Sequence, residues 1–335
     1  MTVCFANFAL TPPVLLAPLA GITDLPFRQL VSRFGAGLVV SEMVASQEMV
    51  QAKPGVREKA ELGFGEAKTA VQLAGREAYW MAEAARMAEA NGARIIDINM
   101  GCPAKRVTSA SGAGASGSAL LRDLDHALSL IEAVVGAVSV PVTLKTRLGW
   151  DDSTRNAADL ARRAESAGVQ MVTIHGRTRQ QFYKGQADWA AIAEIKRAVS
   201  IPVIANGDIV DSATARRALA QSGADGVMVG RAAQGRPWRL AEIAADLFGA
   251  PAPAVPRGAA LAETVAGHVE AMLSFYGPTL GNRMARKHLG WYLDHAGDPA
   301  GLRRRLQTEA DNAEVQRLIA RAFDVDAPST AREAA

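Results

Sequence analysis

Short apolar runs alternate with amphipathic segments along the first 248 residues. Eight runs rich in β-branched residues lie at 14–18, 37–42, 69–73, 94–99, 141–147, 171–175, 202–206 and 226–230. Continuous apolar runs of this length predict strands that are buried on both faces, as in a parallel sheet. Between most of them lie alanine-rich segments with helical periodicity. Two of these, 77–92 and 211–223, end at a glycine, as a helix C-cap does.

A strand followed by a helix, eight times over, predicts an α/β fold of the (β/α)8 or TIM barrel type for residues 1–248. A doubly wound parallel sheet is the alternative. The next stretch, 249–258, is rich in Pro and Gly and predicts a stiff linker. Residues 259–335 have helical periodicity and no strand pattern, so we expect a small C-terminal helical domain.

Composition adds limits to this picture. The 335 residues, 49% of them hydrophobic and 21% charged, suffice for one large domain or for a large and a small one. No run reaches the 18 or so apolar residues of a membrane helix and the N-terminus lacks a leader pattern, so we expect a cytoplasmic protein. We also expect a monomer. Two cysteines cannot form a disulfide framework or a thiolate metal site, which predicts a reducing compartment and no metal. The net charge of +3 permits a polyanionic partner without requiring one.

Polar side chains gather where the predicted strands end. In a TIM barrel the loops after the strands converge on one site. The strand ends carry Pro18, Glu42, Gln72, Asn99 with Cys102, Lys145 with Arg147, His175, Asn206 with Asp208, and Gly230 with Arg231. The glycine-rich turns after the seventh and eighth strands can bind phosphate through backbone N–H groups. We therefore expect a phosphorylated ligand at these two turns.

Lys145 allows two interpretations. A fixed cation beside the phosphate would stabilise a group that gains negative charge, such as a reduced flavin ring. The same amine could form a Schiff base in a barrel aldolase.

Several blocks, in this order, resemble the signatures of the tRNA-dihydrouridine synthases, most of all the bacterial B-type: LAPLAGITDLPFRQL, VQLAG, DINMGCPAKRV, VTLKTRLGWDD, TIHGRTRQQFYKG, IPVIANGDI and GADGVMVGRAAQGRPW. The likeness continues into FYGPTLGNRMARKHLGWYL, 275–293, which resembles the tRNA-facing segment of the family. It implies an enzyme that reduces the C5–C6 double bond of a uridine in tRNA, with FMN recharged by NADPH or NADH. The B-type likeness implies a D-loop uridine, with position 17 as the expected one.

This chemistry implies a role for Cys102. A hydride that arrives at C6 from the flavin leaves an enolate, which must take a proton at C5 from the opposite side of the base. A thiol on a loop after a strand can supply it, so we expect Cys102 to be the general acid. Lys105 and Arg106 would favour a thiolate, and we expect them to contact RNA phosphate instead. The alternative for Cys102 is a small buried hydrophobe.

The resemblance also implies a set of flavin contacts. Gln72 can donate to and accept from a flavin edge, His175 can donate, and Arg231 can hold the phosphate. For His175 a core histidine bound to a carbonyl is the alternative. Leu19 replaces the methionine common in the family, a swap that conserves apolar volume. The implied contacts are Pro18, Leu19, Ala20, Gln72, Lys145, His175, Asn206, Gly207, Asp208, Gly230 and Arg231.

Further residues are expected to contact the RNA. Asn99 is expected at the uracil edge, and Arg147 is expected to add to the cation field. Arg283, Arg286 and Lys287 have the spacing of one helix face, and His288, Trp291 and Tyr292 follow them. Cations with aromatic rings suit phosphate contact and base stacking. The alternative is a solvated helix face with Trp291 in the core.

One segment departs from the family pattern. The loop after CPAKRV, 108–117, is longer than usual and consists almost entirely of small residues. Gly112, Gly114 and Gly117 spell G-x-G-x-x-G, but no strand directly precedes them and no acidic strand end follows at the required distance, which argues against a dinucleotide turn. The composition predicts a mobile lid that would affect the placement of Cys102.

Three other functions stay open at this point. A flavin barrel acting on a free pyrimidine would not need the basic helical domain. A barrel aldolase would use Lys145. A barrel that only binds RNA would carry no chemistry.

Overall fold

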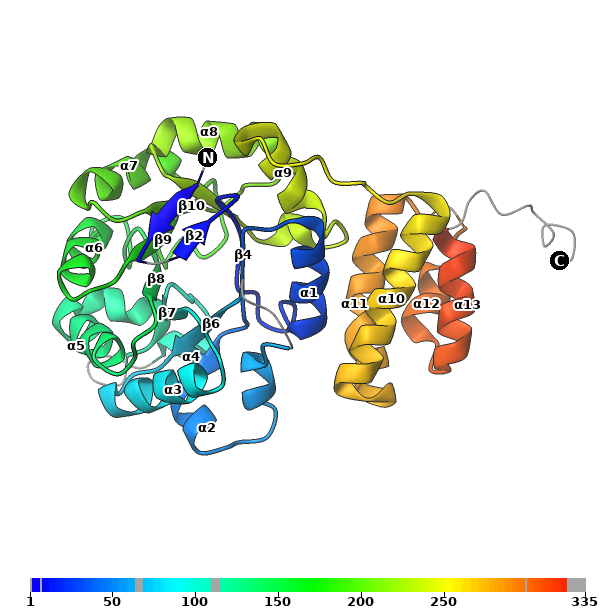
Figure 1. The fold of residues 1–335 in the computed structure, drawn as a ribbon, viewed down its shortest axis with the longest axis horizontal. Coiled ribbons are helices and arrows are strands. Elements are labelled where there is room, and N and C mark those ends of the chain that lie inside the picture. Colours follow the sequence, from blue (N-terminus) through cyan, green and yellow to red (C-terminus); the bar gives the residue numbers. More distant parts are fainter. Residues whose placement is uncertain (1, 7, 64–68, 110–114, 299, 324–335) are drawn as a thin grey trace, which may run out of the picture. The chain divides into compact units, whose positions relative to one another are not determined.

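The computed structural model describes residues 2–6, 8–63, 69–109, 115–298 and 300–323. Its main feature is a parallel sheet that closes on itself (Figure 1), because β4 pairs with β3 on one side and β6 on the other. The predicted TIM barrel is confirmed, and the doubly wound sheet is wrong. The barrel strands are β3 (Val14–Leu16), β4 (Leu38–Val40), β6 (Thr69–Ala74), β7 (Ile96–Met100), β8 (Val142–Arg147), β9 (Met171–His175), β10 (Val203–Asn206) and β11 (Gly226–Val229).

Helices surround the barrel (Figure 1), and one of them, α3, has a buried face made mainly of small residues. The buried face of α3 consists of Met81 and the alanines Ala84, Ala85 and Ala88, which allow the helix to lie close to the sheet. As predicted, α8 ends at a glycine, Gly223, with a left-handed φ of 65°. The helices are α1 (Leu25–Phe34), α2 (Ser46–Val50), α3 (Ala78–Ala90), α4 (Lys105–Thr108), α5 (Leu124–Val135), α6 (Ala157–Ser166), α7 (Trp189–Ala198), α8 (Ser212–Ser222) and α9 (Arg239–Phe248), with short 3-10 turns η1 (Arg57–Ala60), η3 (Gly117–Arg122) and η4 (Arg231–Ala233).

The second barrel strand is interrupted, which the sequence pattern does not predict. The apolar run 37–42 forms β4 only as far as Val40, and pairing with β6 resumes at β5 (Val44–Ala45). At the interruption the Ser41 hydroxyl accepts the backbone N–H of Gln72 at 3.0 Å, where a strand would offer a carbonyl. The serine side chain thus replaces one sheet hydrogen bond and frees Glu42 from the strand.

The N-terminus adds a small antiparallel hairpin of β1 (Val3–Phe5) and β2 (Phe8–Leu10), which the sequence pattern also leaves unpredicted. Val3, Phe5 and Leu10 belong to one buried apolar cluster with barrel residues such as Leu15 and Met228. The hairpin therefore extends the barrel core.

The chain divides into two compact units. The barrel unit consists of Met1–Arg231 with Arg239–Ala252, and the second unit consists of Ala232–Trp238 with the chain from Pro253 onward. The second unit contains α10 (Gly258–Tyr276), α11 (Pro278–Ala296), α12 (Arg303–Thr308) and α13 (Asn312–Phe323), so the predicted helices after the barrel are confirmed. A Cβ at Gly281 would lie 2.5 Å from the Met272 carbonyl oxygen, so glycine allows α10 and α11 to approach closely.

The domain boundaries at 248 and 258 stay a prediction, and the last predicted residues, 324–335, lie outside the described chain. Within the described chain, no helix combines the length and the hydropathy that crossing a membrane requires.

Candidate active site

The carboxyl ends of the barrel strands meet at one rim, where most of the predicted site residues lie. In the parallel register Asn99 pairs with Lys145, Arg147 pairs with His175, and His175 pairs with Asn206. Lys145 and Arg147 are two residues apart on one strand, so all five side chains lie on the same side of the sheet. The structure thus brings together the predicted cations, amides and histidine.

A row of buried side chains connects β6, β7 and β8. Gln72 Nε2 donates to Asp97 Oδ2 at 2.7 Å, and Asn99 Nδ2 donates to Gln72 Oε1 at 2.8 Å. Thr143 Oγ1 donates to Asp97 Oδ1 at 2.6 Å. Burial raises the pKa of Asp97, although the hydrogen bonds from Thr143 and Gln72 oppose this effect. The row fixes both amide orientations and leaves one N–H of Gln72 and one of Asn99 without a partner among the described residues.

Asn99 continues this row into the Cys102 loop. Its Oδ1 accepts the backbone N–H groups of Gly101 at 3.1 Å and Cys102 at 2.9 Å. On the other side of the loop, the Cys102 carbonyl accepts both the N–H and the hydroxyl of Ser118, at 3.1 and 2.8 Å. The Cys102 thiol is free and half-buried. The loop is therefore anchored at the backbone on both sides, and the thiol stays accessible.

Gly117 is the one glycine of the G-x-G-x-x-G pattern that the described chain includes, since Gly112 and Gly114 lie outside it. It has a φ of 55°, and a Cβ there would lie 2.9 Å from the Cys102 carbonyl oxygen. Gly117 thus allows the two ends of the loop to meet. Half of the predicted lid, residues 110–114, lies outside the described chain.

Lys145 is the central cation of the rim. Its Nζ donates to Asn206 Oδ1 at 3.1 Å, and Asn206 Nδ2 donates to the Met228 carbonyl at 2.8 Å. Burial and the nearby Arg147 charge lower the pKa of Lys145 to about 8. The amine is therefore protonated at neutral pH and deprotonates readily in mild alkali. With one acceptor from the protein, it can donate further hydrogen bonds to a ligand.

Arg147 donates most of its hydrogen bonds to backbone carbonyls of the protein, which the sequence does not predict. Its Nε donates to the Gly101 carbonyl at 2.8 Å, and its Nη1 donates to the carbonyls of Thr178 and Phe182 at 3.0 and 2.9 Å. Burial lowers its pKa to about 10, so it remains a cation at neutral pH. Arg147 joins the Cys102 loop to the loop after β9, and only Nη2 stays open to a substrate.

His175 is surrounded by cations. Its pKa lies well below the usual value because of burial first, and then because of Arg147, Lys145, Arg177 and Arg231. The imidazole is therefore neutral at pH 7. It lies 3.3 Å from Arg177 Nη1 through its Nε2 rather than against a carbonyl, so the alternative of a carbonyl-bound core histidine is not what the structure describes.

Arg177 is a site residue that the sequence analysis missed. Its guanidinium is 2% exposed and binds both carboxylate oxygens of Asp208, at 2.9 and 2.6 Å. It also donates to the carbonyls of Lys184 and Gly185, at 3.0 and 2.7 Å. Burial alone would raise the pKa of Asp208, but the hydrogen bonds from Arg177 and from the Ala187 N–H outweigh it and lower that pKa. The Asp208 carboxylate is thus occupied by protein donors. The backbone N–H of Asp208 remains available to a ligand.

Two exposed aromatic residues on the loop after β9 were also missed. Phe182, with a left-handed φ of 55°, and Tyr183 are 40% and 49% exposed, and their rings meet edge to face. The guanidinium carbons of Arg147 and Arg231 lie 5.6 and 5.5 Å from the centre of the Tyr183 ring. The motif TRQQFYKG contains this pair, and an aromatic pair after a barrel strand is the signal that could have found it.

The turns after β10 and β11 fit a phosphate group. In the described chain the backbone N–H groups of Gly207, Asp208, Gly230 and Arg231 form no hydrogen bond. Gly207 has a φ of 107°, and a Cβ at Gly230 would meet only Ala17 and Leu19 side chains, at 3.7 and 3.8 Å. The Arg231 side chain is 64% exposed. Open N–H groups, open space and an exposed cation, which lies 3.8 Å from the Asp208 carboxylate, together suit a phosphate.

The predicted first-strand residues, Pro18, Leu19 and Ala20, form a turn directly after β3. Leu19 N–H donates to Thr23 Oγ1 at 2.9 Å, and Gly21 N–H donates to the buried Glu42 carboxylate. Pro18 and Leu19 are partly exposed and Ala20 is exposed, so this turn can contact a ligand above the barrel.

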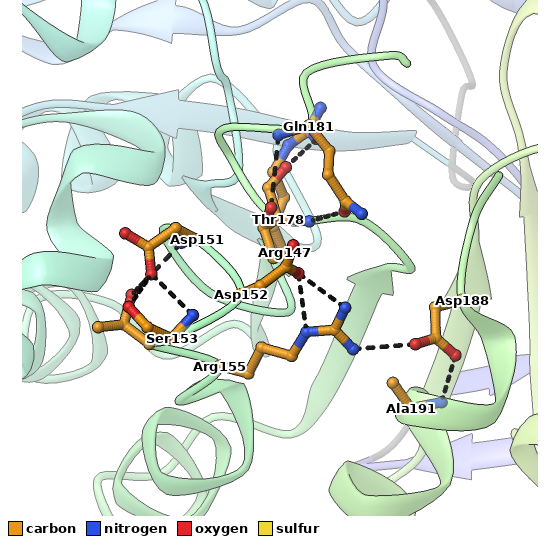
Figure 2. A network of polar contacts seen from close by, with 10 residues as sticks. Arg147, Asp151, Asp152, Ser153, Arg155, Thr178, Gln181, Asp188 and Ala191 are labelled. Carbon is orange, nitrogen blue, oxygen red and sulfur yellow. Dashed lines mark hydrogen bonds and ion pairs between the residues drawn. The ribbon is translucent and has the colours of Figure 1, made fainter. Parts of the chain in front are cut away.

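The loops after β8 and β9 are joined on the outside of the rim. Figure 2 shows Arg155 between Asp152 and Asp188, with Arg155 Nη1 2.9 Å from Asp188 Oδ2. Asp188 also caps α7 through the Ala191 N–H at 3.0 Å. This network holds the loop after β8 against the start of α7, outside the predicted site.

The predicted RNA-contacting residues have different surroundings. Lys105 and Arg106 are exposed on α4, and Arg283 is exposed on α11, whereas Lys287 is half-buried and Arg286 donates to the Glu309 carbonyl at 3.4 Å. His288 and Tyr292 are each only 1% exposed. The expected base stacking on these two rings is therefore wrong, because α10 and α11 bury them against His268. Trp291 is half-buried.

No group of three or more metal-binding side chains exists in the described parts of the chain.

Solved structures with a similar fold include histamine dehydrogenase from Rhizobium sp. 4-9, with a TM-score of 0.55 and 12% identity over 80% of this chain and 50% of that one. A 2-naphthoyl-CoA reductase complex has a TM-score of 0.57 and 13% identity over 75% of this chain and 52% of that one. The chain thus spans about half the length of both proteins. At this identity the likeness supports the barrel fold alone.

Sequence relatives are much closer. A protein named probable tRNA-dihydrouridine synthase from Rhodobacter capsulatus is 63% identical over 96% of this chain and 98% of its own length. Another of that name from Rhizobium leguminosarum bv. phaseoli is 54% identical over 94% and 96%. A tRNA-dihydrouridine synthase B from Xanthomonas axonopodis pv. citri is 48% identical over 86% of each chain. The family described as dihydrouridine synthase (Dus) matches residues 15–327, and the chain belongs to this family.

Proposed function

We propose that this protein is a tRNA-dihydrouridine synthase, which reduces the C5–C6 double bond of a uridine in tRNA to 5,6-dihydrouridine. The observation that carries the proposal is the placement of Cys102. Its thiol is half-buried, and its backbone N–H is held by Asn99, which pairs with Lys145 on the neighbouring strand. Family membership and relatives of that name over nearly the whole chain support it further.

The rim residues fit an FMN cofactor. The open N–H groups at Gly207, Asp208, Gly230 and Arg231 would hold its phosphate, with the Arg231 side chain beside them. Gln72, Lys145, His175 and Asn206 would contact the ring, as would the turn at Pro18, Leu19 and Ala20. When bound, the flavin would supply hydride to C6 of the uracil, and NADPH or NADH would be the reductant. Lys145 is protonated at neutral pH, so it provides the positive charge that an electron-rich ring requires.

The protein residues complete the reaction at the other carbon. Reduction at C6 leaves negative charge on C5 and the C4 oxygen, and the Cys102 thiol donates its proton to C5. Asn99 and Ser118 hold the loop so that the thiol stays at the rim. Arg147 Nη2 and the remaining N–H of Asn99 can donate to uracil oxygens. His175, neutral at pH 7, can act as a hydrogen-bond donor without adding a further charge.

Recognition of the tRNA is assigned to cations on two helices. Lys105 and Arg106 lie on α4 directly after the Cys102 loop, and Arg283 with Arg286 and Lys287 lies on α11. The resemblance of the sequence motifs to the B-type implies a D-loop uridine, and position 17 is our proposed target. A free pyrimidine would give the second unit no role, and a Schiff-base aldolase would give none to Cys102.

The test is a pair of cysteine variants. Cys102→Ala is expected to bind FMN and tRNA as the wild type does, to oxidise NADPH, and to lose most dihydrouridine formation. Cys4→Ala removes the other thiol, which is exposed in the N-terminal hairpin, and is expected to keep full activity. Unchanged product formation by Cys102→Ala would rule out the proton-donor assignment.

A further inference from the structure

Three neighbouring rim loops bring together Arg122, Trp150 and Arg179, none of which the proposed mechanism uses. Arg122 ends the 3-10 turn after the Cys102 loop, Trp150 follows β8, and Arg179 follows β9. The guanidinium carbons of Arg122 and Arg179 lie 4.9 and 4.8 Å from the centre of the Trp150 ring. Cation–π contact holds both guanidinium groups in place at the rim. It thereby lowers the side-chain entropy that is lost when they bind a ligand.

The two charges are not neutralised by the protein. Over the described ranges, no carboxylate lies within ion-pair distance of Arg122 or Arg179. The two acids next to them in the chain are engaged elsewhere. Asp123 caps α5 through the His126 N–H at 3.0 Å, and Asp151 accepts hydrogen bonds from Ser153 and Thr154 in its own turn. Two cations beside one ring without an acid partner leave positive charge uncompensated there, and an anionic ligand would compensate it.

Arg179 shows where such a ligand would act. Its backbone N–H donates to the Gly149 carbonyl at 2.9 Å, and its Nη2 donates to Thr108 Oγ1 at 2.9 Å. Its Nε is buried and has no partner within the described chain. Thr108 ends α4, the helix that follows the Cys102 loop and carries Lys105 and Arg106. The pair of arginines thus extends the predicted phosphate contacts of α4 around the rim.

We propose that Arg122 and Arg179, held on Trp150, form a binding site for a backbone phosphodiester of the tRNA next to the target uridine. The inference rests on the proposed function, since it assumes that the RNA enters this rim. Planar guanidinium groups suit phosphate oxygens, and each contact would release a bound counterion. Because Arg179 also binds Thr108, the phosphate contact is linked to the helix behind Cys102.

The experiment measures the affinity for an unmodified tRNA transcript at several salt concentrations. The rim variant is Arg122→Gln with Arg179→Gln. The matched control is Arg216→Gln with Arg217→Gln, which removes two exposed arginines from α8, one of them also over a tryptophan, Trp189, at 5.7 Å. The rim variant is expected to bind about tenfold more weakly and to have a log–log salt slope less negative by roughly 0.7 to 1.8, and the control is expected to match the wild type.

The possible outcomes separate the two proposals. A rim variant with the affinity and salt slope of the control would overturn the phosphate site, whether or not the enzyme is active. Loss of NADPH affinity in flavin reduction without RNA, with an unchanged RNA slope, would assign the cations to the nicotinamide nucleotide and also overturn it. If the rim variant shows the expected slope change but the wild type forms no dihydrouridine, the phosphate site is supported and the proposed reaction is contradicted. Near-UV circular dichroism of both variants checks the fold.

Discussion

The side-chain oxygen of Asn99 lies 2.9 Å from the backbone nitrogen of Cys102 and accepts its hydrogen bond. The carboxyl end of strand β7 thus supports the loop that carries the candidate proton donor. The same amide donates to Gln72, whose other end binds the buried Asp97. The barrel strand therefore holds the Cys102 backbone on one side, and Ser118 holds its carbonyl on the other.

Asn99→Ala tests this support. The variant leaves two backbone N–H groups without their acceptor, so the Cys102 loop is expected to lose its fixed position. Dihydrouridine formation under saturating tRNA should fall by roughly 10- to 100-fold, while the tRNA dissociation constant should change less than threefold. Single-turnover kinetics and a binding titration measure the two quantities. A rise in the dissociation constant with an unchanged rate would instead make Asn99 a residue for substrate binding alone.

Lys145 predicts a pH dependence. Burial and the Arg147 charge lower its pKa to about 8 in the ligand-free protein, so the cation is present below that pH and is lost as the pH rises through it. The value of kcat/KM should therefore decline above about pH 8. Lys145→Arg keeps the charge and should move the decline to higher pH, whereas Lys145→Met should be slow at every pH. A decline at the same pH in wild type and Lys145→Arg would assign the titration to a group other than Lys145.

Gly207 and Gly230 form a matched pair for the phosphate site. Alanine at Gly207 would have a left-handed φ and place its Cβ 2.9 Å from Ala187, so Gly207→Ala should lower the free energy of unfolding by roughly 1 to 3 kcal/mol. Alanine at Gly230 meets nothing closer than 3.7 Å, so the flavin-free variant should keep its stability within about 0.5 kcal/mol.

The FMN affinity of Gly230→Ala should nevertheless fall, by about tenfold, because the methyl group enters the space assigned to the phosphate. Urea unfolding of the flavin-free protein and a fluorescence titration with FMN provide the two readouts. Normal FMN binding by Gly230→Ala would move the phosphate to another part of the rim.

His288 predicts acid sensitivity of the second unit. Burial, followed by the charges of His268 and Lys287, lowers its pKa well below 6.5. The unfolded chain therefore takes up a proton near pH 6.5 that the folded chain takes up only at lower pH. Stability is complete above about pH 6.5 and declines below it, by roughly 1.4 kcal/mol per pH unit for one proton.

His288→Phe should reduce this decline, because a phenyl ring of similar size takes up no proton. Urea unfolding between pH 5 and 8 compares the two proteins. His175, whose pKa is also lowered, contributes the same loss of stability at low pH to both proteins, so it does not affect the comparison. Equal pH dependence in wild type and variant would contradict the assignment to His288.

The barrel was predictable because its strands are buried on both faces, so each appears as a continuous apolar run between turn residues. The break between Val40 and Val44 was not predictable, because it depends on a hydrogen bond from the Gln72 backbone N–H to the Ser41 hydroxyl that no local pattern contains. The N-terminal hairpin has strands of only three residues, too short for a periodic signal, and it forms because the barrel core covers its apolar side.

The candidate site divides in a similar way. Residues at strand ends, such as Lys145 and His175, were predictable because the barrel gathers all strand ends at one rim. Arg177 was missed although it lies two residues after His175, because its partner Asp208 is 31 residues away in the chain. His288 and Tyr292 were misassigned because helical spacing alone does not say which face of α11 meets α10.

The most direct test of the central claim measures flavin and product together. The purified protein is examined by visible absorbance, then mixed with NADPH and unmodified tRNA, and dihydrouridine is quantified by position. We expect bound FMN and new dihydrouridine at a D-loop uridine. A colourless protein that binds no added FMN, or a flavoprotein that oxidises NADPH without forming dihydrouridine in any tRNA, would contradict it.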